Sequence, residues 1–472
     1  MRTFGNLLAF SPELWLLAGA VVVLLQARLM PRTSTTTVAL VSLVLAFLAL
    51  ATQFTQDGAF LLDGFAIFIQ VVLLGAAALC LLAGRADILP GESPATAEPA
   101  FFLLATLGAM LAASAAEMVS LFLALELLAV NLYLLAGLAR RGAGGISAGL
   151  GYLVLGAASS AVLLYGLAVI FGLSGETRLP AAGQALASLH GTQPALLLAL
   201  CLVLAGFAIR MGLLPVRWWT RGFETGVPPR VIMFVLSVGV AAAFAVFGRI
   251  AVSTFGGSHI PLAAVIAVVA ALAMTAGNLL ALTQSSVRRL VVYSGIAQAG
   301  YALVAFTDLK RAGIAALLVF LTALALTSIC AFAVIIAYAR SVHSDAIRDL
   351  AAMSRTTPGL AIALGLAVVS LAGLPPVAGF FGKLLVLQAA VDGGFAWLAV
   401  VGALNIVLAA LGYVRILRIA FVDPPVFEVA PVRLGLGIRA AVTLSASGIV
   451  FLGLFLGPLY AAASYGKAAI LH

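Results

Sequence analysis

Residues 370–383 read SLAGLPPVAGFFGK and stand in the middle of an apolar run that extends from residue 358 to residue 391. The run is longer than the ~20 residues that a helix needs to cross a bilayer. Adjacent prolines within it remove backbone hydrogen bonds and break the helical axis, and Lys383 follows the break. This pattern predicts a transmembrane helix that is interrupted near its middle, with a charged side chain at the interruption.

A second stretch with the same features occurs earlier in the chain. Residues 206–215 read GFAIRMGLLP, so glycine, arginine and proline again interrupt an apolar segment, 193–214. The two segments are five predicted helices apart and therefore cross the membrane in opposite directions. Glycine and proline are common in membrane helices in any case, but interruptions at corresponding positions of two halves are typical of inverted repeats with a site at the breaks. We therefore predict two inverted repeats.

The composition excludes a soluble domain. Of 472 residues, 64% are hydrophobic and 9% are charged, whereas soluble domains carry about 25% charged residues. Backbone groups in hydrocarbon must bond within their own segment, so long apolar runs without alternating strands indicate helices. The net charge of +9 does not indicate nucleic-acid binding, because the basic residues stand singly or in pairs between apolar runs and form no continuous patch.

The predicted fold is an all-α integral membrane protein of about 14 transmembrane helices, in which helices 4–8 and 9–13 form the inverted repeats and helices 7 and 12 are broken. The predicted helices are 7–27, 36–54, 60–84, 100–115, 117–138, 148–172, 193–214, 229–250, 260–282, 286–306, 310–339, 358–391, 395–418 and 436–461. Segment 178–191 is too short to span and is expected along the surface. Within one membrane domain we expect an N-terminal three-helix segment, two repeats and a C-terminal helix at 1–99, 100–250, 251–420 and 421–472.

The basic residues also predict an orientation. Most Lys and Arg residues fall in alternate loops, and by the positive-inside rule both termini are then on the outer side of the membrane. On this assignment Arg249 belongs to an outer loop, and Asp63 lies near a helix end at the membrane interface.

Three ionisable residues, Glu126, Arg210 and Lys383, fall near the middle of predicted spans. A charge at the bilayer centre costs about 2.5–3.5 kcal/mol on insertion scales, and such residues usually face the bundle interior and mark a proton or ion path. A structural ion pair that locks two helices is the alternative. Glu126 and Arg210 carry opposite charges within one predicted repeat, so we expect them to pair.

Lys383 and Arg210 differ in what they can do with a proton. Arginine is not deprotonated in proteins, whereas a desolvated lysine can lose its proton. The chain otherwise prefers arginine, so a lysine at mid-membrane indicates a group that releases a proton. We predict that Glu126, Arg210 and Lys383 carry the proton path.

Uncharged polar residues within the spans are candidates for lining this path. Ser294, Gln298 and Tyr301 follow i, i+4, i+7 spacing and share one helix face, and Asn278 and Asn405 lie in other spans. Each of them alone is more typical of helix packing. Together with the charges, they predict a hydrated axis through the bundle.

The chain carries no motif for a metal, a nucleotide or a redox cofactor. Its three Cys residues lie in separate apolar segments, and its four His residues lie in predicted loops or at the terminus without metal-ligand spacing. Nothing matches a Walker loop, a dinucleotide fingerprint or an iron–sulfur spacing. We expect no metal or cofactor in this chain, so any electron carriers belong to partner chains.

Three stretches taken together resemble a known family. They are SLFLALELL at 120–128, VYSGIAQAGY at 292–301 and the stretch at 370–383. The chain resembles the antiporter-like membrane subunits of respiratory complex I, the proton-pumping NADH:quinone oxidoreductase, and most closely the subunit N group. The same family includes subunits of multi-subunit cation/proton antiporters. The resemblance implies the same helix count and repeats, a central hydrophilic axis, and roles for Glu126 and Lys383 in two half-channels.

The chain departs from the family pattern in its relay residues. Arg210 stands at the usual lysine of helix 7, and Val240 at the lysine of helix 8. Gln298 stands at the usual histidine of helix 10, and Ser147 and Gly151 replace a glutamate and a lysine near the start of helix 6. A complete lysine relay is therefore absent.

The resemblance implies a proton-translocating membrane-arm subunit without a redox site of its own. NADH, FMN, iron–sulfur clusters and quinone would belong to partner subunits. The direct partners would be membrane lipid and other membrane-arm subunits of the M, K, J and L types, and through them the peripheral redox arm. We expect a bacterial cell (inner) membrane location. Two alternatives stay open: a subunit of a multi-subunit cation/proton antiporter, or a divergent and largely structural membrane-arm subunit.

Overall fold

The computed structural model describes residues 10–30, 34–51, 59–85, 96–138, 143–188, 193–213, 226–258, 261–309, 312–342, 344–351, 353–424 and 434–471. Within these ranges the chain is helical, and its β-type pairing is limited to isolated bridges such as Phe60 with Ala115. The all-α prediction is therefore confirmed for the described part of the chain.

The first half of the chain forms α2 (Ser11–Leu29), α3 (Thr36–Leu50), α4 (Gly64–Gly84), α5 (Glu98–Ser114), α6 (Met118–Leu138), α7 (Ala143–Ser174), α8 (Leu179–Ser188) and α9 (Gln193–Ala208). The next four elements form one continuous helix, Pro229–Phe255. They are α11 (Pro229–Phe234), the π-helical turn η2 (Val235–Gly239), α12 (Val240–Ile250) and a second π-helical turn, η3 (Ala251–Phe255). We call this continuous helix helix 8, after its place among the predicted spans; it is distinct from the short α8.

The second half forms α13 (Leu262–Leu282), α14 (Val287–Val304), η4 (Ala305–Thr307), α15 (Gly313–Val342), η5 (Ile347–Leu350), α16 (Met353–Thr356), α17 (Pro358–Ala372), α18 (Ala378–Asp392), α19 (Ala396–Phe421), α20 (Leu436–Leu454) and α21 (Leu456–Leu471). Most predicted helices therefore begin and end within a few residues of the observed ones.

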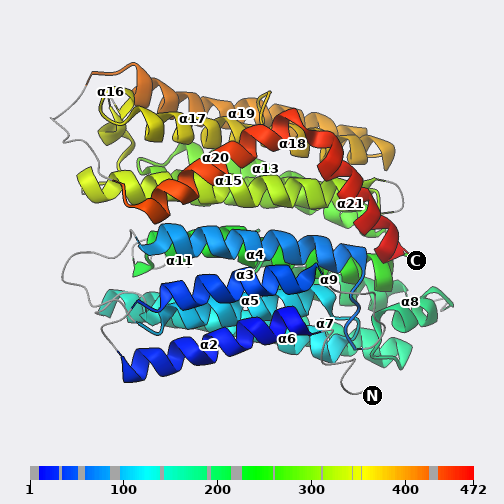
Figure 1. The fold of residues 1–472 in the computed structure, drawn as a ribbon. Coiled ribbons are helices and arrows are strands. Elements are labelled where there is room, and N and C mark those ends of the chain that lie inside the picture. Colours follow the sequence, from blue (N-terminus) through cyan, green and yellow to red (C-terminus); the bar gives the residue numbers. More distant parts are fainter. Residues whose placement is uncertain are drawn as a thin grey trace.

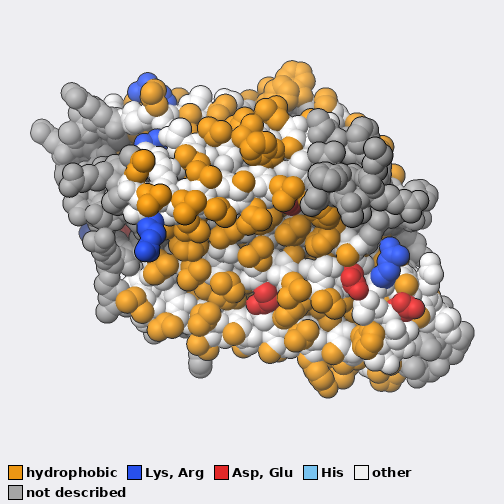
Figure 2. Space-filling view, turned by 60° about the horizontal axis from the view of Figure 1, so that its bottom comes forward, with side chains coloured by type: hydrophobic (Ala, Val, Ile, Leu, Met, Phe, Trp, Pro, Cys, Tyr) orange, Lys and Arg blue, Asp and Glu red, His pale blue; other side chains and the backbone are white. Residues whose placement is uncertain are grey.

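The apolar helices are long enough to cross a bilayer. Ten of the described helices reach 18 residues or more with few charges, and four shorter apolar helices accompany them, Thr36–Leu50, Glu98–Ser114, Pro194–Ala208 and Pro358–Ala372. Exposed leucine and valine side chains cover the outer helices, and Figure 2 shows one such face with few charged groups. A surface of this kind suits lipid, and we describe the chain as a multi-pass membrane protein. The exact number of spans and the two repeats stay predictions.

The helices run side by side along one direction (Figure 1). Helix 8 and α15 lie inside the bundle, with 94% and 89% of their apolar windows buried, whereas α2, α19 and α20 have 33% buried. The first described helix, α2, begins at the end of the bundle where α21 finishes.

One element, the C-terminal helix, differs from the sequence-based expectation, and the short segment before α9 gains a defined structure. The predicted helix 436–461 is two helices, because Pro458, in the first turn of α21, cannot donate the hydrogen bond that would continue α20, and the chain bends at Phe455. The segment predicted along the surface forms the short helix α8, whose inward face buries Leu179 and Leu186.

Two buried ion pairs hold the ends of helix 8. At its start, the Arg230 guanidinium donates to both Glu98 carboxylate oxygens, at 2.7 and 3.1 Å. Near its end, Arg249 donates to both Asp63 oxygens, each at 2.9 Å. The expected placement of Arg249 in a loop is wrong, because Arg249 lies within α12. Asp63 stands at a helix end as expected, where it caps the start of α4. The two side chains are 2% and 4% exposed. Paired bidentate geometry is what allows such charges to be buried.

Candidate functional site

The first helix break places Arg210 in the bundle. The α-helix α9 ends at Ala208, and the chain continues through a turn in which Gly212 takes a left-handed φ of 74°. Arg210 lies in this turn. The helix thus ends where the glycine and proline pattern predicts a break, but Pro215 and the segment that would continue the helix lie outside the described residues, so a broken helix stays a prediction here.

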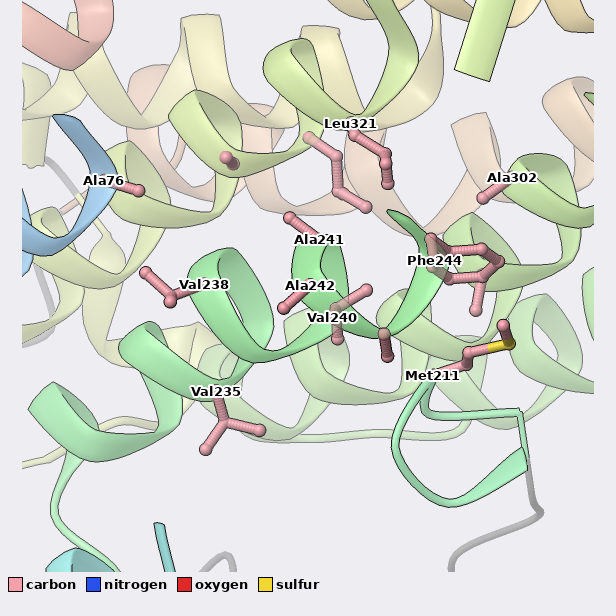
Figure 3. Packing of buried hydrophobic residues seen from close by; sticks show 14 of the residues in the cluster. Ala76, Met211, Val235, Val238, Val240, Ala241, Ala242, Phe244, Ala302 and Leu321 are labelled. Carbon is pink, nitrogen blue, oxygen red and sulfur yellow. The ribbon is translucent and has the colours of Figure 1, made fainter. Parts of the chain in front are cut away.

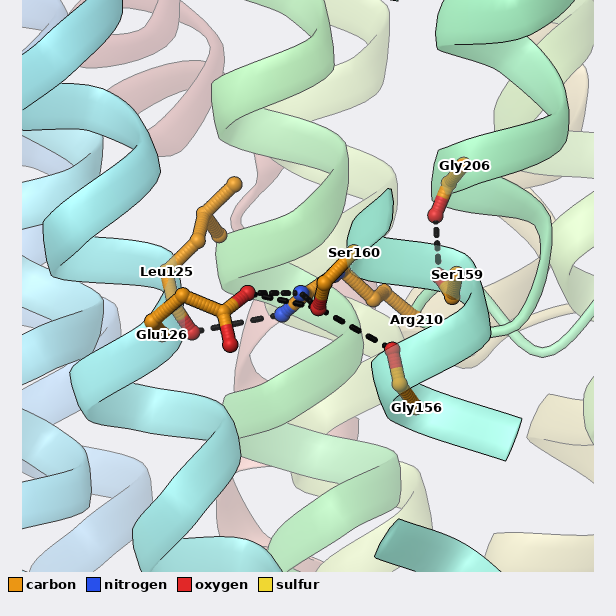
Figure 4. Close-up of polar contacts among 7 residues, drawn as sticks. All are labelled: Leu125, Glu126, Gly156, Ser159, Ser160, Gly206 and Arg210. Carbon is orange, nitrogen blue, oxygen red and sulfur yellow. Dashed lines mark hydrogen bonds and ion pairs between the residues drawn. The ribbon is translucent and has the colours of Figure 1, made fainter. Parts of the chain in front are cut away.

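Arg210 meets Glu126 of α6, as the opposite charges predicted (Figure 4). Its Nη2 atom donates to Glu126 Oε1 at 2.7 Å and to Ser160 Oγ at 2.6 Å, and its Nη1 donates to the Leu125 carbonyl at 3.2 Å. The Ser160 hydroxyl in turn donates to Glu126 Oε1 at 2.6 Å. A neighbouring serine, Ser159, donates to the Gly206 carbonyl at 2.5 Å and joins α7 to α9. The pair is thus fixed by three helices.

A small cavity adjoins this pair on the side of helix 8. It has a volume of about 30 Å³ and is lined by residues that include Tyr133, Tyr152, Arg210 and, from the π-helical turn, Val235 and Gly239. The Arg210 Nε atom is buried without a protein partner. A cavity of this size, next to polar groups, is large enough for one water molecule.

The second helix break is fully described. Helix α17 ends at Ala372, Gly373 takes a left-handed φ of 83°, and α18 begins at Ala378 after the two prolines. The Ser370 hydroxyl pairs with Thr327 Oγ1 of α15 at 2.7 Å and accepts from the Gly379 amide at 3.2 Å. Side chains therefore satisfy part of the backbone that the break sets free.

Lys383 projects from α18 back into this break. Its Nζ donates to the Leu371 carbonyl at 2.7 Å and to the Ala372 carbonyl at 3.2 Å. These carbonyls form the C-terminus of α17, where the helix dipole favours a cation. The Nζ also stands 4.3 Å from the centroid of the Tyr301 ring, a cation–π contact. Lys383 is 1% exposed, and none of the ion pairs between described residues includes it.

The polar residues predicted to line the path fall into three small groups. Gln298 Nε2 donates to the Leu371 carbonyl at 2.9 Å, so it shares an acceptor with Lys383. Ser294 pairs with the Tyr413 hydroxyl, and Asn278 Nδ2 donates to Asn405 Oδ1 at 3.0 Å. The Tyr301 hydroxyl donates to the Gly402 carbonyl at 2.7 Å. Gln298 and Tyr301 thus surround Lys383, whereas the asparagine pair joins α13 to α19.

The two breaks are separated by apolar packing around helix 8. Figure 3 shows Val240, Ala241 and Phe244 packed among buried side chains that include Met211 and Leu321. On one side of helix 8 this packing reaches the turn of Arg210, and on the other it reaches the helices around Lys383. The side chains therefore bring together Glu126 with Arg210, and Lys383 with Tyr301 and Gln298, in two separate groups on opposite sides of this packing.

Sequence reasoning missed the two ion pairs at the ends of helix 8. Their partners are 186 and 132 residues apart in sequence, so no local spacing joins them. One signal was present: Arg249 stands between apolar residues on both sides, within the run AVFGRIAVS. Within the described ranges, no three His, Cys, Asp or Glu side chains gather as a metal-ligand group.

Comparisons with known proteins agree with the motifs. A family model described as "NADH:quinone oxidoreductase/Mrp antiporter, TM" matches residues 115–409. The NADH-quinone oxidoreductase subunit N of Methylobacterium nodulans is 34% identical over 469 residues, which cover 97% of this chain and 96% of the relative.

Solved structures share the fold. A chain of respiratory complex I from Thermus thermophilus matches with a TM-score of 0.82 and 30% identity, covering 96% of this chain and 100% of that one. A chain of the Mrp complex from Dietzia, 22% identical, matches with a TM-score of 0.86 over 98% of each chain. The resemblance inferred from the three motifs is confirmed, and the chain belongs to the family of NADH:quinone oxidoreductase and Mrp antiporter membrane subunits.

Proposed function

We propose that this chain is a proton-translocating membrane-arm subunit of an NADH:quinone oxidoreductase. Electron transfer in partner subunits would drive movements of the broken helices, and the buried groups at the two breaks would bind and release protons in response. The chain itself would supply no redox chemistry, and its contribution to the enzyme would be proton movement through Glu126, Arg210 and Lys383.

The observation that carries the proposal is the placement of one cation inside the bundle at each helix break, Arg210 mostly buried and Lys383 fully buried. Arg210 lies in the turn after α9, and Lys383 lies against the end of α17. A broken helix exposes unpaired backbone groups to the bundle interior, and a charge placed there responds to small shifts of the two half-helices. Moving one charge against 100 mV takes about 2.3 kcal/mol, which is within the range of rearranging a buried ion pair.

The proposal also names the surroundings of the chain. Its direct neighbours would be membrane-arm subunits of the M, K, J and L types and lipid, and NADH, FMN, iron–sulfur clusters and quinone would reside in partner subunits. We place it in the bacterial cell (inner) membrane with both termini on the outer side. The inverted repeats at 100–250 and 251–420 belong to this proposal, with 1–99 and 421–472 outside them.

The test is Lys383→Met in the assembled complex, with Lys467→Met in α21 as the matched control. The ammonium group is lost from the break in the first variant, while the second removes a lysine outside it. We expect Lys383→Met to lower the ratio of protons moved to electrons transferred in sealed membrane vesicles, and Lys467→Met to leave the ratio unchanged. An unchanged ratio in a fully assembled Lys383→Met complex would contradict the proposal.

One observation favours a second candidate, a largely structural subunit. The apolar packing around Val240 separates the two breaks, where the family resemblance implies a lysine. In that case Lys383→Met and Lys467→Met would both leave the ratio unchanged. A Val240→Lys variant sharpens the choice, because a lysine between two working half-sites changes the ratio, whereas in a structural subunit it disturbs only assembly.

A further inference from the structure

One buried carboxyl group, that of Glu13, lies outside both helix breaks, in the N-terminal three helices. Glu13 is in the first turn of α2, and Gln70 is in the second turn of α4. They are 5% and 0% exposed, respectively. Glu13 belongs to the opening stretch SPELW at 11–15, and the proposed proton path does not use it.

The Glu13 and Gln70 side chains share one hydrogen bond, and each also has an oxygen atom without a partner. Gln70 Nε2 donates to Glu13 Oε1 at 3.1 Å and to the Met110 carbonyl of α5 at 3.4 Å. This uses both hydrogens of the amide. Two acceptor atoms are left buried without a partner, Glu13 Oε2 and Gln70 Oε1. They belong to the same two side chains that already share one hydrogen bond.

One proton on the Glu13 carboxyl group would give both unpaired oxygen atoms a hydrogen bond. An ionised carboxylate only accepts hydrogen bonds, but a protonated one has one O–H donor. A hydrogen on Glu13 Oε2 would serve the Gln70 Oε1 acceptor, so that acid and amide exchange two hydrogen bonds in a closed ring. The neighbouring Met110 carbonyl accepts a second bond from Ser114 Oγ at 3.2 Å, which leaves it no need of another donor.

The ion pairs of the described residues also favour a protonated Glu13. None of the ion pairs between described residues includes Glu13. Two other buried carboxylates, Asp63 and Glu98, are each held by an arginine that donates to both of their oxygens. A buried carboxylate without a cation carries a large desolvation cost, which protonation removes.

We propose that Glu13 is a protonated carboxylic acid paired with Gln70, and that the N-terminal three-helix segment therefore holds a proton-binding site outside the two repeats. Loss of the proton breaks one of the two bonds and leaves two acceptors facing each other. Occupancy of the site is thus coupled to the contact between α2 and α4.

The test is infrared spectroscopy of the assembled complex in water and in deuterium oxide. Glu13→Gln is the main variant, because a neutral amide reproduces both the donor and the acceptor of a protonated acid. The exposed Glu176→Gln is the matched control. In the spectrum of wild type minus Glu13→Gln we expect the carbonyl stretch of a hydrogen-bonded carboxylic acid, with a downshift in deuterium oxide. The Glu176→Gln difference should show loss of carboxylate bands instead.

Loss of carboxylate bands in the Glu13→Gln difference, with no carboxylic acid carbonyl stretch, would overturn the proposal. Should Glu13→Gln fail to assemble, Gln70→Leu decides. That variant removes the amide but leaves the acid, so a protonated Glu13 gives a carbonyl stretch shifted to higher frequency than in wild type. Absence of any change in the carboxylic acid region of Gln70→Leu would overturn the proposal as well. Neither result depends on proton pumping, so this test fails or succeeds separately from the proposed function.

Discussion

The two helix breaks hold their cations in opposite ways. At the first break, Arg210 is paired with an anion, and the Arg210 and Glu126 side chains are 11% and 28% exposed. At the second, Lys383 is 1% exposed and is held by the carbonyls of a half-helix and by an aromatic ring.

A cation in an ion pair and a cation held only by backbone carbonyls and an aromatic ring differ in how easily they exchange a proton. An ion pair that includes arginine keeps both members charged, because the guanidinium does not give up its proton. A lysine held only by dipoles has no counter-charge to fix its state, so its proton can leave without stranding an anion. Under the proposed function, the ion pair at the first break would therefore have to open before a proton is bound there, whereas Lys383 at the second break would release its proton without breaking an ion pair.

Exchanging arginine and lysine at the two positions is the strongest test of this difference between the two breaks. Lys383→Arg keeps the charge but removes the releasable proton and adds bulk in a closed site. Arg210→Lys keeps the charge beside Glu126. We expect Lys383→Arg to lose as much of the proton-to-electron ratio as Lys383→Met, and Arg210→Lys to retain it in the same vesicle assay. Equal tolerance of the two exchanges would show that the breaks do not differ in this respect.

The two left-handed glycines, one beside each cation, allow a matched pair of alanine substitutions, for which a smaller effect is expected. Gly212 and Gly373 both have left-handed φ values, 74° and 83°. No described atom lies within 4 Å of a Cβ added at Gly212, whereas at Gly373 the Lys383 Cδ would stand 2.6 Å away. Gly212→Ala should cost about 1–2 kcal/mol for the backbone conformation. Gly373→Ala should cost about 1–3 kcal/mol more, because Lys383 must move aside.

Thermal denaturation of the purified complexes measures this difference. The proton-to-electron ratio gives a second readout, since only Gly373→Ala displaces Lys383, the group proposed to carry the proton. Equal stability losses for the two alanine variants, with the ratio unaffected in both, would mean that the second break is less closed than its contacts indicate.

The sequence predicts the breaks themselves well, because their cause is local. Proline and left-handed glycine act through the backbone of a few residues, so the end of α9 near Arg210 and the interruption before Lys383 can be predicted from the sequence alone. The pairing of Glu126 with Arg210 follows from opposite signs at the same depth. The partners of Lys383 are harder to predict from the sequence, because they are backbone carbonyls, at Leu371 and Ala372, and any residue type supplies a carbonyl.

The ends of helix 8 and the Glu13–Gln70 contact are not predictable in the same way. Each joins helices that are far apart in sequence, and each uses residues that also suit a membrane interface. Asp63 caps the start of α4, where its side chain accepts from the Ala66 amide at 2.7 Å, an ordinary use of aspartate at a helix start. Only the packing of α4 against helix 8 shows that the same carboxylate also binds Arg249.

The neutral partners at each break give the smallest and most discriminating test. Ser160→Ala removes a donor to Glu126 and an acceptor for Arg210, and hydrogen bonds to charged groups contribute about 1.5–3 kcal/mol. Tyr301→Phe removes only the bond to the Gly402 carbonyl and keeps the ring beneath Lys383, so about 0.5–1.5 kcal/mol is expected. In thermal denaturation Ser160→Ala should therefore be the less stable variant, while the proton-to-electron ratio of Tyr301→Phe stays at the wild-type value. If Tyr301→Phe lowers the ratio, the hydroxyl as well as the ring supports Lys383, and the cation at the second break then depends on a side-chain hydroxyl, as the cation at the first break does through Ser160.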